Sequence, residues 1–398
     1  MTDQSVQLSP IAGKSILSFS IDRWTDVWRG RHHMLTRFAK TNTVLHACQP
    51  FYIRDAISEL RHRGEVRTGV AKVADNLYTY TPPRWLPKSF RFPAVDRAIT
   101  ELRHRQIRAA MRSVGMTRPI LYIWHPQMAE AMGAFDECLV VYHCYDEFLS
   151  FDIDQASRET LARQEKEILR RADIVFATAA ELCERRRPLN PNIHLVTNGV
   201  DFELFAAAQD VRTEIPRDLA GIRPPIIACV ATQMRVIDLP LIAEIFTRRP
   251  DWSFVFVGME RTPEPEAGSL LGMVQSLPNI HFIGRRPLDQ IPGYLKGCNV
   301  CTIPYALTDT VACGSPLKMY EYLAAGKPVV SRSLPFTSHL SSVVSFGEDA
   351  GEWIAAIEAA QRDEGPARIE ARQAIARENT WDQRVMFIQG KLAEALRR

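Results

Sequence analysis

The sequence lacks the features of a secreted or membrane-spanning protein. Its first ten residues are polar and show no basic-then-apolar signal pattern. No uninterrupted apolar run approaches the ~18 residues that a membrane-spanning helix needs. With 46% hydrophobic and 24% charged residues, the composition is that of a folded globular chain rather than a disordered one. We therefore expect the protein to remain in the cytoplasm.

Signals for metals and redox cofactors are also scarce. The eight cysteines are scattered, and several lie in apolar runs, which favours buried and reduced thiols. Cys298 and Cys301 have metal-ligand spacing, but no second Cys/His pair completes a zinc site, so we expect both to pack in a core. Neither half has a G-x-G-x-x-G after its first strand, which argues against a nicotinamide-dependent oxidoreductase. We expect neither a metal nor a cofactor.

Positive and negative charges nearly balance over the whole chain, but they are unevenly distributed along the sequence. The net charge is +3, yet residues 1–120 hold 20 Lys and Arg against 9 Asp and Glu, a balance of +11. Such an excess indicates an anionic partner, such as a lipid surface, a phosphorylated substrate or nucleic acid. A solvated basic face explains the excess equally well.

Short apolar strands alternate with longer amphipathic helices in two series, which predicts parallel α/β sheets. The first series has its clearest helices at 96–114 and 156–171, where apolar residues recur at three-to-four spacing. Its expected strands are 15–20, 43–47, 119–124, 138–142, 174–177 and 193–196. The expected strands of the second series are 226–230, 253–258, 280–283, 300–304 and 328–331, with helices at 239–247, 288–295 and 317–325.

This alternation predicts two Rossmann-like domains. We expect an N-terminal domain over 1–205, a linker at 206–225, a C-terminal domain over 226–378 and a closing helix at 379–398 that returns to the N-terminal domain. Two open sheets joined by one linker create a cleft, and ligands of such sheets bind beyond the carboxyl ends of the strands. Polar residues just after each strand are therefore the candidates for a site.

The sharpest motif is the stretch 314–330, which predicts a loop, a helix opening at Ser315-Pro316, and a strand. Ser as N-cap and Pro at the first helical position are start signals. A helix N-terminus offers free N–H groups and a positive dipole end, which suit a diphosphate, and Lys318 adds a charge. Glu321, one turn along, is suited to accept hydrogen bonds from ribose hydroxyls. An ordinary amphipathic helix with solvated Lys318 and Glu321 is the alternative.

This stretch resembles the nucleotide-sugar signature of GT-B-fold glycosyltransferases. Residues 277–284 with 291–295 resemble a strand and helix of that family, 198–201 the end of its N-terminal domain, and 380–382 the start of its closing helix. The resemblance spans roughly 142–381. It is nearest to bacterial cell-surface polysaccharide transferases of the exopolysaccharide and teichuronic-acid type. It implies two Rossmann-like domains facing across a cleft and a nucleotide-diphosphate sugar as donor.

The resemblance also implies the members of a donor-binding site. Lys318 would contact the diphosphate and Glu321 the ribose, while Tyr320 would either line the site or pack the helix. Arg235 would contact a donor phosphate and Tyr305 would line the pocket for the base or sugar. Asp238 is expected to cap the following helix and to orient Arg235. The full donor set is Arg235, Tyr305, Ser315, Leu317, Lys318, Tyr320 and Glu321.

The resemblance leaves one position unmatched. Many retaining relatives carry a glutamate where this sequence has Cys313, which cannot act as a carboxylate. We therefore expect an inverting transfer, which needs a general base for the acceptor hydroxyl. Asp146, after the expected strand 138–142, is the candidate catalytic residue. Glu147 is the reserve, and His143 is expected to orient either carboxylate.

The acceptor side is expected in the N-terminal third. Segments 23–37 and 84–92 interleave Trp and Phe with cations, which suits a bilayer interface, a pyrophosphate-linked lipid acceptor, or packing on the core. His125, after another expected strand, is suited to touch a sugar or to make a structural hydrogen bond.

We predict a metal-independent transferase that moves a sugar from a nucleotide-diphosphate sugar to a glycan or lipid-linked glycan. It would be cytoplasmic or peripheral on an anionic membrane surface at the inner face of the cell membrane, with no nucleic-acid partner. A retaining transferase, a sugar-nucleotide epimerase and an oxidoreductase are the alternatives.

Overall fold

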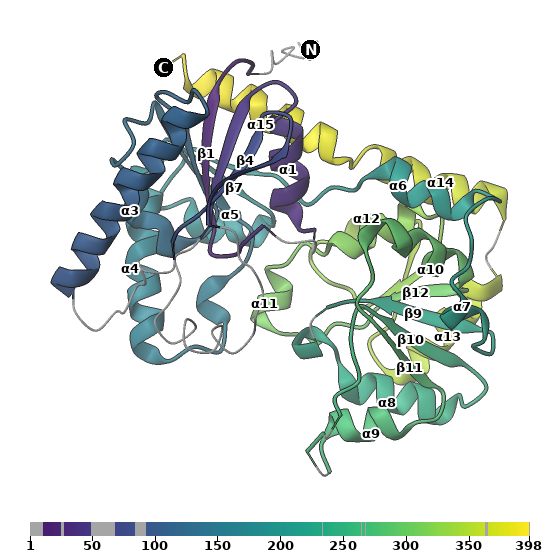
Figure 1. Ribbon diagram of the computed structural model, residues 1–398. Coiled ribbons are helices and arrows are strands. Elements are labelled where there is room, and N and C mark those ends of the chain that lie inside the picture. The colour runs from purple at the N-terminus through teal and green to yellow at the C-terminus, as the bar shows by residue number, and fades with distance from the viewer. Residues whose placement is uncertain are drawn as a thin grey trace. The chain divides into compact units, whose positions relative to one another are not determined.

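The computed structural model describes residues 11–24, 28–48, 68–83, 93–232, 234–263, 265–266, 268–362 and 365–397. The chain forms two compact units (Figure 1). Unit 1 comprises Met1–Thr197 together with Arg384–Arg398, and unit 2 comprises Asn198–Gln383. Each unit is built on a largely parallel sheet with helices on both faces, so the predicted α/β fold class with two Rossmann-like domains is confirmed.

Unit 1 contains an eight-stranded sheet in the order β3-β4-β2-β1-β5-β6-β7-β8. All neighbours pair in parallel except β3, which runs antiparallel to β4 at one edge. The inner strands are buried on both faces, as their continuous apolar runs require. The strands are β1 (Ser15–Phe19), β2 (Thr43–Ala47), β3 (Gly69–Ala74), β4 (Leu77–Thr81), β5 (Ile120–Ile123), β6 (Leu139–Cys144), β7 (Ile174–Ala177) and β8 (Ile193–Leu195).

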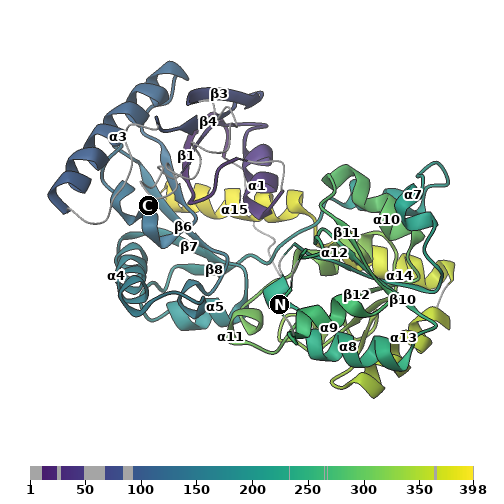
Figure 2. The same ribbon diagram turned by 60° about the horizontal axis from the view of Figure 1, so that its bottom comes forward.

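The helices of unit 1 cover both faces of this sheet, with α3 and α4 outermost on one side (Figure 2). α4 begins where the Asp154 carboxylate accepts a hydrogen bond from the Ser157 N–H at 2.9 Å, an N-cap that the sequence permits. The helices are α1 (Gly30–Phe38), α3 (Pro93–Ser113), η1 (Pro126–Ala131), η2 (Phe148–Ser150), α4 (Gln155–Arg171), α5 (Ala180–Arg186) and α15 (Trp381–Ala395), whose residues from Arg384 on belong to unit 1.

Unit 2 contains a six-stranded sheet in the order β11-β10-β9-β12-β13-β14, all parallel. Successive strands extend first to one side of β9 and then, from β12, to the other. Such a reversal point is where doubly wound sheets bind ligands. The strands are β9 (Ile226–Val230), β10 (Ser253–Val257), β11 (Ile280–Gly284), β12 (Val300–Ile303), β13 (Val329–Ser331) and β14 (Val344–Phe346).

The helices of unit 2 pack on this sheet through two buried clusters, one on each face. Tyr322 and Leu323 of α12 belong to the first cluster, and Trp353 of α13 to the second. The helices are α6 (Phe202–Ala206), η3 (Ala207–Gln209), α7 (Arg217–Ala220), η4 (Met234–Val236), α8 (Leu239–Arg248), α9 (Leu270–Ser276), η5 (Leu288–Gln290), α10 (Ile291–Gly297), α11 (Asp309–Ala312), α12 (Leu317–Ala324), η6 (Ser338–Leu340), α13 (Ala350–Arg362) and α14 (Pro366–Arg377).

Every strand expected from the sequence is present, but β3, β4 and β14 were not expected. The segment 206–225 differs from the linker that its prolines suggest. It contains η3 and α7, and Leu219 is fully buried in the core of unit 2. The segment therefore packs as part of unit 2, and the division between the units falls after Thr197.

Candidate functional site

The start of α12 is fixed by a residue far away in the sequence. Pro316 is the N-cap residue of α12. The Ser315 hydroxyl accepts a hydrogen bond from the Asn198 N–H at 3.3 Å, and the Asn198 side-chain amide donates to the Ser315 carbonyl. The prediction that Ser315 caps the helix is therefore wrong, because its hydroxyl is used to anchor the loop before the helix to Asn198.

Lys318 and Glu321 form an ion pair in the first turns of α12. Lys318 Nζ donates to Glu321 Oε2 at 2.8 Å, and the two side chains are 22% and 6% exposed. Two solvated side chains on an outer helix face, the alternative considered from the sequence, would be far more exposed. A nearly buried carboxylate needs a charged partner, and the Lys318 ammonium supplies it.

The remaining expected donor residues on α12 differ in their surroundings. Tyr320 is buried in the core cluster that also holds Tyr322, which agrees with the packing role considered for it. Leu317 is half-buried at the start of the helix. The Tyr322 hydroxyl accepts a hydrogen bond from the Val230 N–H at 2.8 Å. This bond holds α12 against the end of β9. At β9 the strand order changes sides, because β10 and β11 lie on one side of it and β12 to β14 on the other.

The loops that follow β9 and β12 are joined by backbone hydrogen bonds. Ile237 and Tyr305 form an antiparallel bridge. The Asp238 N–H donates to the Pro304 carbonyl at 2.8 Å, and the Ala306 N–H to the Val236 carbonyl at 2.9 Å. The loop after β9 is the one that carries Arg235, in η4. Both expected loops therefore lie at the reversal point of the sheet.

Tyr305 lies close to the ion pair on α12. Burial raises the pKa of the Tyr305 hydroxyl, and the negative charge of Glu321 raises it further. Tyr305, Lys318 and Glu321 are thus brought together within unit 2. Gly258, at the end of β10, has a φ of +103°, and a Cβ there would lie 2.6 Å from the Ala231 carbonyl oxygen. Only glycine permits the backbones after β9 and β10 to approach this closely.

Asp238 performs one of its two expected tasks. Its carboxylate accepts a hydrogen bond from the Leu241 N–H at 3.0 Å and so caps α8, as predicted. Its other oxygen receives Arg332 Nη2 at 2.5 Å rather than Arg235. Arg332 directly follows β13 and was missed in the sequence, although a cation immediately after an apolar strand is a usable signal.

In unit 1, Asp146 lies just beyond the carboxyl end of β6 and is half-buried. Its Oδ1 accepts a hydrogen bond from the Glu147 N–H at 3.1 Å. The Glu147 carboxylate itself is buried and receives two hydrogen bonds from Arg186, at 3.0 and 3.1 Å. Arg186 also donates to Glu165 at 2.9 Å. Glu147, the second candidate for the general base, is therefore held in a buried ion-pair network.

The two histidines considered near this site are structural. His143 is fully buried, hydrogen-bonds the Tyr122 hydroxyl through Nδ1 at 2.7 Å and stacks on Trp124, so the prediction that it orients Asp146 or Glu147 is wrong. Burial lowers the pKa of His143 to about 3. His125 accepts a hydrogen bond from the Gln127 N–H and caps η1, and burial lowers its pKa to about 4.

Much of the first basic-aromatic segment is packed rather than exposed. The ring of Trp24 contacts the rings of His32 and His46, at centroid distances of 4.4 and 5.7 Å. Arg31 is buried and pairs with Asp22 at 2.9 Å. Packing on the core, one of the three roles considered for residues 23–37, therefore applies to these side chains. The second segment, 84–92, lies outside the described residues.

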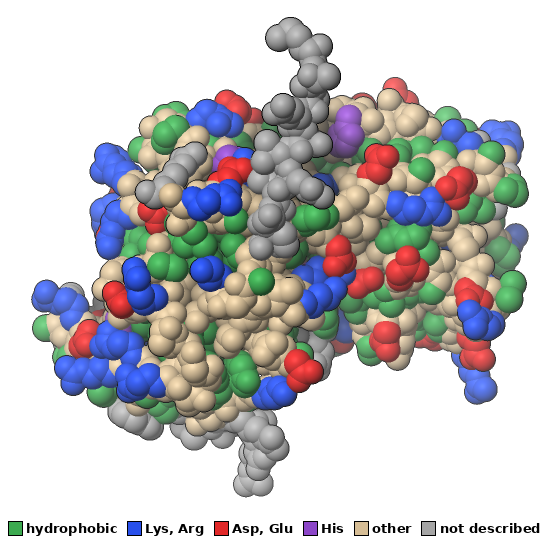
Figure 3. Space-filling view, turned by 90° about the horizontal axis from the view of Figure 1, so that it is seen from above, with side chains coloured by type: hydrophobic (Ala, Val, Ile, Leu, Met, Phe, Trp, Pro, Cys, Tyr) green, Lys and Arg blue, Asp and Glu red, His purple; other side chains and the backbone are tan. Residues whose placement is uncertain are grey.

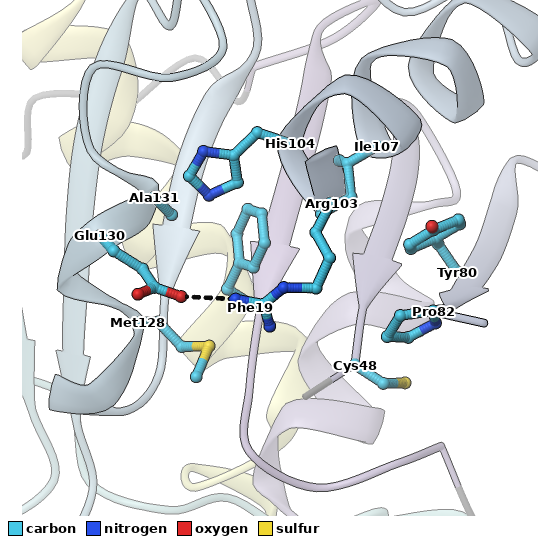
Figure 4. Close-up of a pocket in the computed structure, with 10 residues that line it drawn as sticks. All are labelled: Phe19, Cys48, Tyr80, Pro82, Arg103, His104, Ile107, Met128, Glu130 and Ala131. Carbon is cyan, nitrogen blue, oxygen red and sulfur yellow. Dashed lines mark hydrogen bonds and ion pairs between the residues drawn. The ribbon is translucent and has the colours of Figure 1, made fainter. Parts of the chain in front are cut away.

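A small pocket in unit 1, which the sequence did not suggest, opens at the carboxyl ends of β1, β2 and β4 (Figure 4). Figure 4 shows Arg103 reaching toward Glu130, with the rings of Phe19 and His104 beside them. The Arg103–Glu130 ion pair measures 2.9 Å. The pocket is lined by Phe19, Cys48, Tyr80, Pro82, Arg103, His104, Ile107, Met128, Glu130 and Ala131.

Possible metal ligands take other roles in the structure. Cys298 and Cys301 are buried in the core of unit 2, as expected, and the Cys298 thiol donates to the Tyr294 carbonyl at 3.0 Å. Asp152 and Asp154 form an Asp-x-Asp sequence, but Asp154 is the N-cap of α4. Among the described residues, no group of three His, Cys, Asp or Glu side chains is placed to hold a metal ion. Within the same residues, no helix is long and apolar enough to span a bilayer.

One stretch of the chain matches a known protein family. Residues 233–363, which include Arg235, Tyr305 and all of α12, match the family profile described as Glycosyl transferases group 1. TuaH of Bacillus subtilis (strain 168), assigned to teichuronic acid biosynthesis as a glycosyltransferase, is 27% identical over 258 residues. That match covers 61% of this chain and 64% of TuaH, so the chain spans just under two thirds of the length of this relative.

Solved structures support the same fold. Sucrose-phosphate synthase from Thermosynechococcus elongatus aligns with a TM-score of 0.68 at 17% identity, covering 96% of this chain and 98% of that one. Anabaena HepE, solved in complex with UDP and glucose, aligns with a TM-score of 0.66 at 14% identity, covering 96% and 100%. The predicted resemblance to GT-B-fold glycosyltransferases is confirmed.

Proposed function

We propose that this protein transfers a sugar from a nucleotide-diphosphate donor to a glycan acceptor. One observation carries the proposal: the Lys318–Glu321 pair, with Glu321 almost buried, at the start of α12 beside the reversal point of the unit 2 sheet. A helix N-terminus with a lysine in its first turn suits a diphosphate. HepE has been solved with UDP and glucose, which supports a nucleotide-sugar ligand for a fold of this kind.

The donor residues have distinct roles in this proposal. Lys318 and Arg235 stabilise the diphosphate as it leaves with the electron pair of the broken bond. Glu321 accepts hydrogen bonds from the ribose hydroxyls, and Tyr305 lines the pocket beside it. Ser315 and Leu317 lie along the nucleotide. Because these cations and the helix dipole supply the stabilising charge, we propose that the transfer is metal-independent.

For the chemical step we propose Asp146 as general base and inversion at the anomeric carbon. Asp146 takes the proton of the acceptor hydroxyl as its oxygen attacks the anomeric carbon. Glu147 is held by Arg186, which leaves Asp146 as the better placed carboxylate after β6. Cys313, which stands where many retaining relatives have a glutamate, is fully buried and cannot supply a carboxylate.

We further propose that the acceptor is lipid-linked and that unit 1 binds it, with the protein peripheral on an anionic membrane surface. The charge balance of residues 1–120 supports this, as does the assignment of TuaH to synthesis of a cell-surface polymer. An anionic membrane and a pyrophosphate-linked lipid would both be attracted by that charge.

The donor site is tested by calorimetry with nucleoside diphosphates on Lys318→Ala and Glu321→Ala. Each substitution should weaken binding by ~1–3 kcal/mol, the cost of losing a charged partner in a desolvated site. Lys391 and Glu394 on α15 form an ion pair of the same spacing at 2.9 Å, so Lys391→Ala is a matched control that should leave affinity unchanged. Unchanged affinity in the α12 variants would refute the site. Donor consumption without any acceptor would indicate an epimerase instead.

A further inference from the structure

The outer face of α3 exposes apolar side chains along much of its length. Val95 and Leu102, seven residues apart and hence on the same face, are 52% and 38% exposed. Ala98 and Ala109 extend this face and are also exposed. The opposite face is buried, with Ile107 and Met111 in the core of unit 1. The outer apolar positions are therefore not part of the packing that holds α3 in place.

Arginines flank this apolar face. Arg97, Arg105 and Arg112 are exposed, and Glu101 is the one exposed acidic residue among the described positions of α3. Glu101 pairs with Arg108 at 2.8 Å and with Arg105 at 3.5 Å. Figure 3, in which α3 lies at the lower left, shows lysine and arginine side chains gathered there beside hydrophobic atoms. The outer face of α3 is thus both apolar and positively charged.

We propose that the outer face of α3 is a docking surface for an anionic lipid bilayer. A helix that lies in the bilayer interface needs apolar side chains on one face and cations at its border to meet the headgroups. The arginines would also suit nucleic acid, but a nucleic-acid backbone offers nothing to Val95 and Leu102. This inference rests on the proposed membrane location and assigns it to α3, which is distinct from segments 23–37 and 84–92.

Vesicle sedimentation tests the surface on the full chain. The wild-type protein should bind vesicles of phosphatidylglycerol and phosphatidylcholine at low salt and ignore pure phosphatidylcholine. Val95→Gln with Leu102→Gln should reduce the partition coefficient by ~10-fold, because two apolar contacts with the bilayer are lost. Arg97→Gln, Arg105→Gln and Arg112→Gln together should reduce binding by at least as much and flatten its salt dependence.

Unit 2 provides a matched control. Leu270 and Met273 on α9 are exposed to a similar extent, 47% and 53%, so Leu270→Gln with Met273→Gln should bind vesicles like the wild type. Wild-type protein that ignores anionic vesicles, α3 variants that bind normally, or binding to duplex DNA in place of vesicles would each overturn the proposal. Nucleoside diphosphate affinity, measured on the same variants, should stay unchanged. A wild-type protein that binds vesicles but no nucleotide would refute the proposed function alone.

Discussion

At the residue scale, the central prediction concerns Asp146. Asp146→Asn keeps the shape of the side chain and its ability to accept from the Glu147 N–H, but it cannot take a proton. Turnover should therefore fall by ~10²-fold or more, while nucleotide affinity stays near that of the wild type. Steady-state kinetics with a nucleotide-sugar donor, together with the anomeric configuration of the product, provides the measurement.

Asp152→Asn is the control for this experiment, because Asp152 is an exposed carboxylate in the same region of the chain. Its turnover should match the wild type. If Asp146→Asn retains most of its turnover, Asp146 is not the base. A product that keeps the anomeric configuration of the donor would contradict the proposed inversion.

Contacts between residues of one helix could be predicted from the sequence. Contacts between residues far apart in the sequence could not. The spacing of Lys318 and Glu321 already places them on one face of a helix, where an ion pair forms. The bond from Asn198 to Ser315 joins residues 117 positions apart, and no local pattern predicts it. The prediction for His143 was wrong because the expected strand ended at residue 142, whereas β6 continues through Cys144 and the side chain of His143 packs against Tyr122 and Trp124.

At the element scale, Arg186 joins three elements of unit 1. It extends from α5 to Glu165 on α4 and to Glu147 just after β6. Replacing Arg186 with Leu would leave two buried carboxylates without their main partner, which typically costs ~3–5 kcal/mol of the free energy of unfolding. Chemical denaturation should show this loss as an earlier transition of unit 1.

The neighbouring Arg187 provides the comparison, because its ion pair with Glu184 is exposed to solvent. Arg187→Leu should change the free energy of unfolding by only ~0.5 kcal/mol, as exposed pairs do. Equal effects of the two substitutions would show that the Arg186 network contributes no more than a surface pair.

The elements themselves were predictable where burial imposes a pattern. The inner strands of both sheets are continuous apolar runs because helices cover both faces, and these runs identified them. β3 was missed because it is an edge strand with nearly every residue exposed, so no apolar alternation marks it. β14 has only three residues, too few to show a period. The segment 206–225 was misjudged because its prolines suggested a linker, whereas Leu219 is a core residue.

At the scale of the whole molecule, the two units divide the chemistry unequally. Unit 2 holds the pair on α12, the fastened loops after β9 and β12, and Arg332 after β13, all on one chain segment that the family profile covers. Unit 1 holds Asp146, the pocket of Figure 4 and most of the excess positive charge. Unit 2 was therefore recognisable from motifs, whereas the pocket of unit 1 is lined by residues that only the folded chain brings together.

The two units should also differ in their response to acid. Burial lowers the pKa of several histidines of unit 1 from 6.5, most strongly to about 3 for His32, His46 and His143 and to about 4 for His125. Their stabilising contribution is complete above pH 6.5, where neither state binds the protons. As the pH falls below 6.5 the unfolded chain takes them up and the folded unit does not, so stability is lost progressively toward pH 4 and 3.

Between pH 7.5 and 5.5, an interval centred on the unfolded-state pKa of 6.5, each of these four histidines removes ~1.4 kcal/mol from the free energy of unfolding. Together they should remove ~5.5 kcal/mol. Most carboxylates have pKa values below this pH interval, so the change in stability within it comes mainly from the histidines. Scanning calorimetry at the two pH values should show the transition of unit 1 moving to lower temperature more than that of unit 2. His46→Asn should reduce the proton uptake on unfolding by about one. A unit 1 transition that does not move over this interval would contradict the neutral, buried state of these side chains.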